Sequence, residues 1–224
     1  MLGISDNKMD DMMKTIGAIS ELLDKKLTLD SNTLNEGTTA VVVVDMINGF
    51  IKSGALADSR IGNVIQPIVD TIDVMDQAKL LFINDAHSEK SSEFEVYPSH
   101  CLKGSYEGEI VEPIHKYSNS AVIIEKNSTN GFLCDSFQTW FLNEGEQIEN
   151  YIIMGDCTDI CIKQFAISLK AYFNEHNKIK RIIVPINTVE TFHLEATHHH
   201  ADLMNIMSLY EMEQAGIEVV KAII

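Results

Sequence analysis

The sequence predicts an α/β protein with a single sheet of six mostly parallel strands and helices on both faces. Two observations lead to this prediction. Short apolar runs recur along the chain, and they alternate with longer segments in which apolar residues recur at helical spacing. Strands that are apolar along their whole length are typical of parallel sheets, because helices cover both faces of such sheets.

The chain begins with a segment that differs from the rest. Apolar residues recur at helical spacing over 8–25, and a polar stretch follows at 30–39. We interpret 1–38 as an N-terminal helix and connector that lies against the main domain, which spans 39–224. The apolar side chains of this helix serve either the core or the subunit interface of a homo-oligomer, and both alternatives stay open.

Strands and helices then alternate through the main domain. Strands are expected at 40–44, 80–84, 121–124, 151–154, 181–184 and 217–220. Helices are expected at 61–78, 132–142, 159–173 and 201–214, with a long polar loop at 86–108. Since the chain has no internal repeat and no low-complexity segment, this pattern indicates one α/β domain.

The composition is that of an ordinary globular protein with an acidic surface. Of 224 residues, 45% are apolar and 22% are charged, and 17 basic against 33 acidic residues give a net charge of −16. Nucleic acid and anionic membranes are not expected as partners, because both bind concentrated positive charge. The first residues do not resemble a secretory signal, and no apolar run approaches the roughly 20 residues of a membrane span. Four cysteines are too few for a disulfide framework, so we expect a cytoplasmic protein with free thiols.

Side chains of complementary chemistry stand where the predicted strands end. Asp45, Asp85 and Lys126 each close an apolar run, and the turn 155–161 follows a fourth run. A polar residue often simply caps a strand. The carboxyl ends of neighbouring parallel strands, however, meet at one edge of the sheet, about 5 Å apart. Four such ends together therefore indicate a binding or catalytic site.

Cys161 is the cysteine best placed to act as a nucleophile. The segment GDCTDICIKQFA passes from a strand into a helix, with Thr158 or Asp159 as the expected N-cap. Cys161 then lies in the first helical turn. Free N–H groups and the helix dipole favour a thiolate there, and the same N–H groups can receive an oxyanion.

The remaining cysteines and the histidines do not identify an activating base. A free cysteine is more often a small buried residue than a nucleophile, which is our interpretation of Cys134. Cys101 fits either packing or a place beside a metal ligand. Spacing marks no histidine as the base, but Asp45 and Lys126 offer an alternative. The carboxylate would accept the thiol proton, and the ammonium would stabilise the anions.

Three segments resemble the signature segments of the isochorismatase-like cysteine hydrolases. They are VVVVDMINGF (41–50), EKNSTNGF (125–132) and GDCTDICI (155–162). The resemblance covers 38–224 and implies a six-stranded parallel sheet flanked by helices. It implies a catalytic triad of Asp45, Lys126 and Cys161. It also implies a cis peptide bond between Asp156 and Cys157, which directs the N–H groups of Cys157 and Cys161 at the oxyanion.

Within that superfamily, a fourth segment resembles the metal-binding loop of the nicotinamidases. This segment is NDAHSEKSSEFEVYPSHCLKGS (84–105). The resemblance implies that one divalent metal ion is bound by Asp85, His87 and His100. Zinc is the first expectation, with manganese or iron as alternatives, because these ions accept carboxylate and imidazole ligands. Some family members add a loop carboxylate, for which Glu93 is placed, with Glu95 as the alternative.

The resemblance is weaker around the substrate pocket. Tyr97 stands where an aromatic pocket wall is usual, and Phe50 is a second candidate. Ala86 and Ser99 replace an aromatic residue and a proline that are common in nicotinamidases, which affects ring-substituent preference more than the reaction. The histidines at 198–200 are interpreted as a surface cluster, with adventitious metal binding as a lesser alternative.

The resemblance implies the hydrolysis of a small amide, nicotinamide, to nicotinate and ammonia through a thioester, as a step of NAD salvage. One alternative is an amidase of the same superfamily that acts on an open-chain amide without metal. Another is a non-catalytic binding or scaffold protein, which would have no need of the triad. A thiol redox protein is a third, but Cys157 and Cys161 have CxxxC rather than CxxC spacing.

Overall fold

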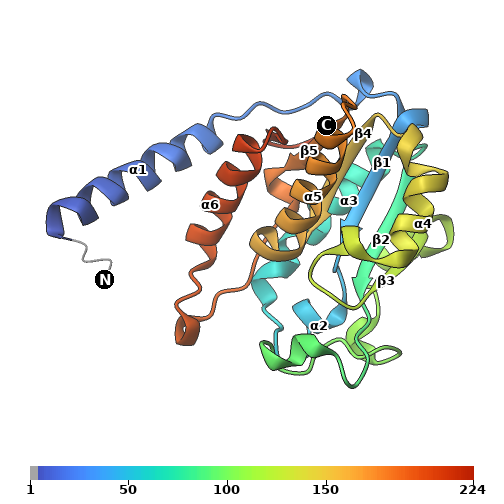
Figure 1. Ribbon diagram of the computed structural model, residues 1–224, viewed down its shortest axis with the longest axis horizontal. Coiled ribbons are helices and arrows are strands. Elements are labelled where there is room, and N and C mark those ends of the chain that lie inside the picture. The colour runs from blue at the N-terminus through green and yellow to red at the C-terminus, as the bar shows by residue number, and fades with distance from the viewer. Residues whose placement is uncertain (1–4) are drawn as a thin grey trace.

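The central sheet is parallel throughout. The computed structural model describes residues 5–224. Six strands pair in the order β3-β2-β1-β4-β5-β6, and every pairing is parallel (Figure 1). They are β1 (Thr39–Val44), β2 (Lys79–Asp85), β3 (Val122–Lys126), β4 (Asn150–Gly155), β5 (Arg181–Pro185) and β6 (Glu218–Val220). The predicted fold class is therefore confirmed. Because the chain runs outward from β1 to β3 and then returns to β4, the strand order reverses between β1 and β4, where such sheets form a crevice.

Helices cover both faces of this sheet. They are α1 (Asp6–Asp24), α2 (Asn48–Ile51), α3 (Ile65–Val74), α4 (Asp135–Asn143), α5 (Lys163–Glu175) and α6 (Ala201–Gln214). On one face, Val42 and Val44 of β1 join an apolar cluster with side chains of α4, α5 and α6. On the other face, Val41 and Val43 pack with side chains of α2 and α3. All six residues of β1 are buried, which explains why the strand is apolar along its whole length.

Three helices begin later than the sequence predicts, each because a tighter or wider turn precedes it. A 3-10 turn at Ser59–Val64 precedes α3, and one at Gly131–Leu133 precedes α4. The Asn130 side chain accepts from the Phe132 N–H at 3.1 Å and so closes the second of these turns. The helix expected at 159–173 is divided into a π-helical turn, Thr158–Ile162, and α5.

The N-terminal helix lies against the main domain only over its second half. Ile19 and Leu23 are buried in the cluster that includes α6, whereas Met9, Met12 and Met13 are exposed. Figure 1 shows the first half of α1 projecting from the body of the protein. The connector that follows it pairs with the C-terminal residues through a bridge between Leu29 and Ile223. None of the helices in residues 5–224 combines the length and the apolar character that a membrane span requires.

Gly155 occupies a turn that a larger residue would distort. It ends β4 with φ at 117°, and a Cβ atom there would overlap the backbone of Val44. We expect Gly155→Ala to lower the free energy of unfolding by at least about 2 kcal/mol, because the strained backbone and the overlap both act on the folded state. Urea unfolding, followed by circular dichroism, measures this difference.

Gly17→Ala is the matched control for this substitution. Gly17 lies inside α1, and a Cβ atom there would have no neighbour within 4 Å. Since alanine favours the helix over glycine by about 0.5–1 kcal/mol, this variant should be at least as stable as the wild type. Equal stability of the Gly155→Ala variant and the wild type would contradict the account of the turn.

Candidate active site

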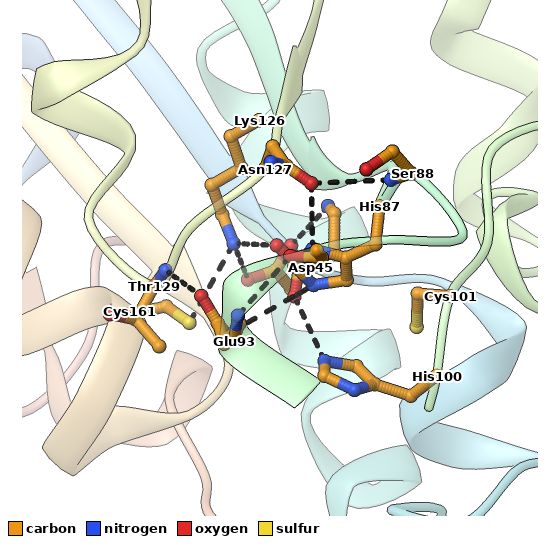
Figure 2. Close-up of polar contacts among 12 residues, drawn as sticks. Asp45, His87, Ser88, Glu93, His100, Cys101, Lys126, Asn127, Thr129 and Cys161 are labelled. Carbon is orange, nitrogen blue, oxygen red and sulfur yellow. Dashed lines mark hydrogen bonds and ion pairs between the residues drawn. The ribbon is translucent and has the colours of Figure 1, made fainter. Parts of the chain in front are cut away.

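The side chains at the ends of four strands converge in the crevice. Asp45 follows β1, Asp85 ends β2, Lys126 ends β3, and Cys161 lies in the turn after β4. The Lys126 Nζ atom lies 2.8 Å from Asp45 Oδ2 and 3.8 Å from Cys161 Sγ (Figure 2). It also forms an ion pair with Asp85. The structure thus brings together the carboxylate, the ammonium and the thiol that the sequence marks as a triad.

Asp45 is held at the centre of this group by the backbone around it. It adopts a left-handed conformation with φ at 54°, which aspartate tolerates better than most residues. Its N–H donates to the Ile83 carbonyl at 2.9 Å, and its Oδ1 atom accepts from the Asp85 N–H at 2.7 Å. The second oxygen, Oδ2, is therefore left to face Lys126.

Burial and the neighbouring charges set the ionisation of these groups. Burial lowers the pKa of Lys126, but Asp45 and Asp85 raise it more, so the pKa of this ammonium lies well above its usual value. Burial raises the pKa of Asp85, but Lys126 and the two histidines lower it more, and the result is a pKa well below the usual range. Burial and the charge of Asp85 together raise the pKa of Asp45 to about 6, against the opposing effect of Lys126. Near pH 7 the group therefore contains one ammonium and two carboxylates.

The surroundings of Cys161 favour the protonated thiol over the thiolate. It is 5% exposed, and burial raises its pKa well above the usual value, although Lys126 acts in the opposite direction. Asp45 and Asp85 raise the pKa further. Burial and the two carboxylates thus oppose the effect expected from the start of the helix and outweigh the ammonium. The thiol needs a base before it can attack.

The turn that carries Cys161 also differs from the predicted helix start. Cys157 precedes the π-helical turn, and Thr158 and Asp159 lie inside it, so the predicted N-cap is wrong. The Asp159 carboxylate instead accepts hydrogen bonds from a loop later in the chain, Thr191 and His199 among its donors. The peptide bond between Asp156 and Cys157 is cis, as the resemblance implies. Among the backbone hydrogen bonds of residues 5–224 outside the regular elements, none has the Cys157 N–H as its donor.

The other two cysteines are packing residues. Cys101 is fully buried, its Sγ atom lies against Gly49, and burial raises its pKa far above the usual value. Cys134 does not lie inside a helix as expected, because α4 begins at the next residue. It is half-buried against the core, and its Sγ atom lies 3.1 Å from the Glu125 carbonyl.

A second group of side chains lies directly beside the triad. Ligand atoms of Asp85, His87 and His100 all lie within 4.8 Å of one another. The Nε2 atoms of His87 and His100 are 3.4 and 3.7 Å from Asp85 Oδ2. The two histidines come together because the loop after β2 folds back on itself. The His87 N–H donates to the Cys101 carbonyl at 3.0 Å, and the Lys103 N–H donates to the His87 carbonyl at 2.9 Å.

The hydrogen bonds of these histidines fit a bound metal ion. Asn127 Oδ1 accepts from the Ser88 N–H at 3.2 Å and lies 3.2 Å from His87 Nδ1, so that ring nitrogen donates (Figure 2). The Nδ1 atom of His100 donates to the Pro98 carbonyl at 2.8 Å. Both Nε2 atoms therefore turn toward Asp85, and His87 Nε2 is buried without a hydrogen-bond partner in the described part of the chain. A carboxylate and two imidazoles suit a divalent zinc, manganese or iron ion.

Glu93 is the loop carboxylate that faces this group. Its Oε1 atom lies 4.0 Å from His87 Nε2, and its Oε2 atom accepts from the Thr129 N–H at 3.1 Å. Glu95, the alternative, is exposed to solvent. Because the Thr129 backbone fixes its orientation, Glu93 could add a fourth protein ligand.

A pocket connects the two groups to the surface. Phe50 and Tyr97 line it, as the sequence predicts, and both rings lie near His100, with centroids 5.7 and 6.2 Å from that of the imidazole. Sequence reasoning missed Ile160 and Phe192, which also line this pocket. Ile160 precedes Cys161 and could have been found from the motif. Phe192 comes from the loop after β5, and no periodicity or spacing marks it.

Comparisons with known proteins agree with this geometry. Residues 39–219 match the family described as the isochorismatase domain. Nicotinamidase 1 of Arabidopsis thaliana is 28% identical over 243 residues, which cover 92% of this chain and 96% of that protein. The pyrazinamidase of Pyrococcus horikoshii, solved in complex with zinc, has a TM-score of 0.66 and 22% identity over 82% of this chain and 99% of that chain. N-carbamoylsarcosine amidase from Thermoplasma acidophilum has a TM-score of 0.64 and 24% identity over 82% of this chain and 96% of that chain. Because both identities are below 25%, these two solved structures show that this chain shares their fold and no more.

Asn127 gives a test of the second group that does not depend on activity. Since its side chain orients His87, we expect Asn127→Leu to weaken zinc binding by about 10–100-fold, as the loss of an outer hydrogen-bond partner typically does. Titration of the purified protein against a chromogenic chelator measures the affinity. Glu95→Gln, at an exposed carboxyl on the same loop, should bind zinc like the wild type. Equal affinities for all three proteins would show that Asn127 does not orient a metal ligand.

Proposed function

This chain belongs to the isochorismatase family, and from that membership we propose that it is a metal-dependent cysteine amidohydrolase that converts nicotinamide to nicotinate and ammonia. One observation carries the proposal. The buried Lys126 ammonium lies between the Asp45 carboxylate and the Cys161 thiol, and Asp85 connects it to the cluster with His87 and His100. Such a reaction would supply nicotinate to pyridine nucleotide salvage.

In the proposed first step, Asp45 removes the thiol proton while Cys161 Sγ attacks the carbonyl carbon of the amide. With its pKa raised to about 6, the Asp45 carboxylate is ionised at neutral pH and is a stronger base than an ordinary aspartate. The Lys126 ammonium lies 3.8 Å from Sγ and stabilises the negative charge as the proton leaves. No histidine is needed as the base.

The N–H groups of Cys157 and Cys161 would hold the oxyanion of the tetrahedral intermediate. Within residues 5–224 the Cys157 N–H donates to no backbone carbonyl outside the regular elements, which supports this role, since a donor already used in the fold would be unable to turn to the substrate. The intermediate then collapses with cleavage of the C–N bond. Asp45 returns its proton to the leaving ammonia, and the acyl group remains on Sγ as a thioester.

Water completes the proposed cycle. Asp45 takes a proton from a water molecule as the water oxygen attacks the thioester carbonyl. The C–S bond then breaks, nicotinate leaves, and the proton on Asp45 returns to the thiolate of Cys161. One amide and one water are consumed, and one carboxylate and one ammonium ion are formed near neutral pH.

Asp85, His87 and His100 would hold the metal ion, with Glu93 as an additional ligand and zinc as the first expectation. When bound, such an ion supplies a Lewis acid that can accept the ring nitrogen of a pyridine carboxamide. Two observations support the assignment: the orphaned Nε2 atom of His87, and the fold shared with a pyrazinamidase that was solved with zinc. Phe50 and Tyr97, which line the pocket, would hold the ring between them while the carboxamide faces Cys161.

Ammonia release from three amides tests this proposal. We expect turnover of nicotinamide and pyrazinamide, which share a ring nitrogen in the same position, and little turnover of an open-chain amide. Treatment with a strong chelator should abolish the activity, and zinc, manganese or iron should restore it. An enzyme that keeps its activity without metal and prefers the open-chain amide would instead be the metal-independent amidase of the same family. A protein inactive on every amide would support a binding or scaffold role.

The nucleophile is tested by removing its sulfur. We expect Cys161→Ala to lower kcat for nicotinamide by at least about 10⁴-fold, because loss of a catalytic nucleophile typically removes the whole covalent route. Cys134→Ala is the matched control, since Cys134 is half-buried outside the pocket and should retain wild-type kcat. Single-turnover quenching followed by mass spectrometry should detect the acyl group on Cys161 in the wild type. Wild-type ammonia release by the Cys161→Ala variant would overturn the mechanism.

A further inference from the structure

His199 does not behave like the histidines on either side of it. His198 and His200 are exposed, but the chain turns at His198, which has φ at 57°, and only 13% of the His199 side chain is exposed. The predicted surface cluster thus describes His198 and His200, whereas the His199 side chain is largely covered. Within residues 5–224, the Asp85 cluster is the one group of three or more potential ligands close enough to hold a metal ion, so the histidine run does not form a second site of that kind.

The His199 ring makes two polar contacts and one stacking contact, all with Asp159 of the nucleophile turn or Phe192 of the pocket wall. Its Nε2 atom lies 2.8 Å from Asp159 Oδ2, and its Nδ1 atom lies 2.9 Å from the Phe192 carbonyl. Both partners are hydrogen-bond acceptors, because a carboxylate and a carbonyl have no hydrogen to donate. The ring also stacks on the Phe192 side chain, with the centroids 4.0 Å apart and the planes 10° from parallel.

Asp159 connects these contacts to the nucleophile. It lies in the π-helical turn two residues before Cys161, and its Oδ1 atom accepts from Thr191 Oγ1 at 2.6 Å. The Thr158 N–H of the same turn donates to the Glu190 carbonyl at 3.0 Å. The loop after β5 is thus tied to the nucleophile turn by its backbone, by Thr191 and by His199.

Phe192 is the part of this loop that reaches the pocket. Its side chain lines the same cavity as Phe50, Tyr97 and Cys161. It also packs against the apolar cluster on the α2 and α3 face of the sheet, which includes Phe50. The His199 ring stacks on its side chain and lies within hydrogen-bond distance of its carbonyl, so His199 restrains both the side chain and the backbone of Phe192 in addition to that packing.

We propose that His199 is a positioning residue. It holds Phe192, which forms one wall of the substrate pocket, against the turn that carries Cys161. In this way it sets the affinity of the pocket for a planar aromatic carboxamide. The inference rests on the function proposed above. His199 does not line the pocket and does not contact Asp45, Lys126 or Cys161. Loss of the His199 side chain should therefore weaken the binding of the substrate's aromatic ring and leave the rates of the chemical steps nearly unchanged.

Steady-state kinetics with nicotinamide test this inference in the metal-loaded enzyme. We expect His199→Ala to raise KM about threefold to tenfold, in the range that aromatic pairs contribute, with kcat within about twofold of the wild type. His200→Ala, at the exposed neighbour, should leave both constants unchanged. Phe192→Ala should raise KM to a similar extent. The double variant His199→Ala/Phe192→Ala should be little worse than either single variant, because both remove the same wall.

A second variant separates positioning from stability. His199→Gln retains a donor for Asp159 but has no ring to stack on Phe192. We therefore expect a melting temperature close to that of the wild type together with a KM raised as in His199→Ala. Isothermal titration of nicotinamide into the Cys161→Ala protein, with and without His199→Gln, should show the same loss of affinity without any turnover.

Two results would overturn the inference while the proposed function stands. One is an active His199→Gln enzyme with unchanged KM. The other is KM effects of His199→Ala and Phe192→Ala that multiply in the double variant, because two independent contributions would then be present. A wild-type protein that neither binds nor hydrolyses nicotinamide would overturn the proposed function, and with it this inference.

Discussion

A buried ammonium holds this active site together. Lys126 is 1% exposed, and an unpaired charge at such depth would be too costly for the fold to retain. It is retained because Asp45 and Asp85, from two neighbouring strand ends, face it directly. This arrangement requires that β1, β2 and β3 lie side by side with their carboxyl ends level. The strand order of the sheet and the charges of the site therefore depend on each other, and loss of either carboxylate would leave an uncompensated charge in the interior.

Asp85 connects the triad and the group of potential metal ligands electrostatically, because it belongs to both. Its Oδ1 atom pairs with Lys126, and its Oδ2 atom faces the Nε2 atoms of His87 and His100. The same carboxylate raises the pKa of both Asp45 and Cys161. A cation held by the histidines would offset the negative charge of Asp85 and so change the basicity of Asp45 without touching it. In the proposed enzyme, metal binding and the basicity of Asp45 would be coupled in this way through one side chain.

The sequence predicted the parts of the protein that depend on local patterns. The apolar runs identified all six strands, and residues such as Asp45 and Lys126 were found because each stands at the end of such a run. What escaped prediction depends on contacts between distant segments. Asn127, which follows β3, orients His87, which follows the neighbouring strand β2. His199 contacts Asp159, which lies forty residues earlier in the chain. The raised pKa of Cys161 escaped for the same reason, since it follows from burial and from charges on other strands rather than from the helix start.

That raised pKa has a consequence for a thiol placed beside a metal site. Thiolates are strong ligands for zinc and similar ions, whereas protonated thiols are weak ones. Cys161 lines the same pocket as Asp85 and His100, so a permanent thiolate could bind the ion that those residues are suited to hold. Burial and the two carboxylates raise the pKa of Cys161, which favours the thiol and so disfavours its binding to that ion. In the proposed mechanism, Asp45 removes the proton once the carbonyl of the amide is in place, which would keep the nucleophile for the substrate.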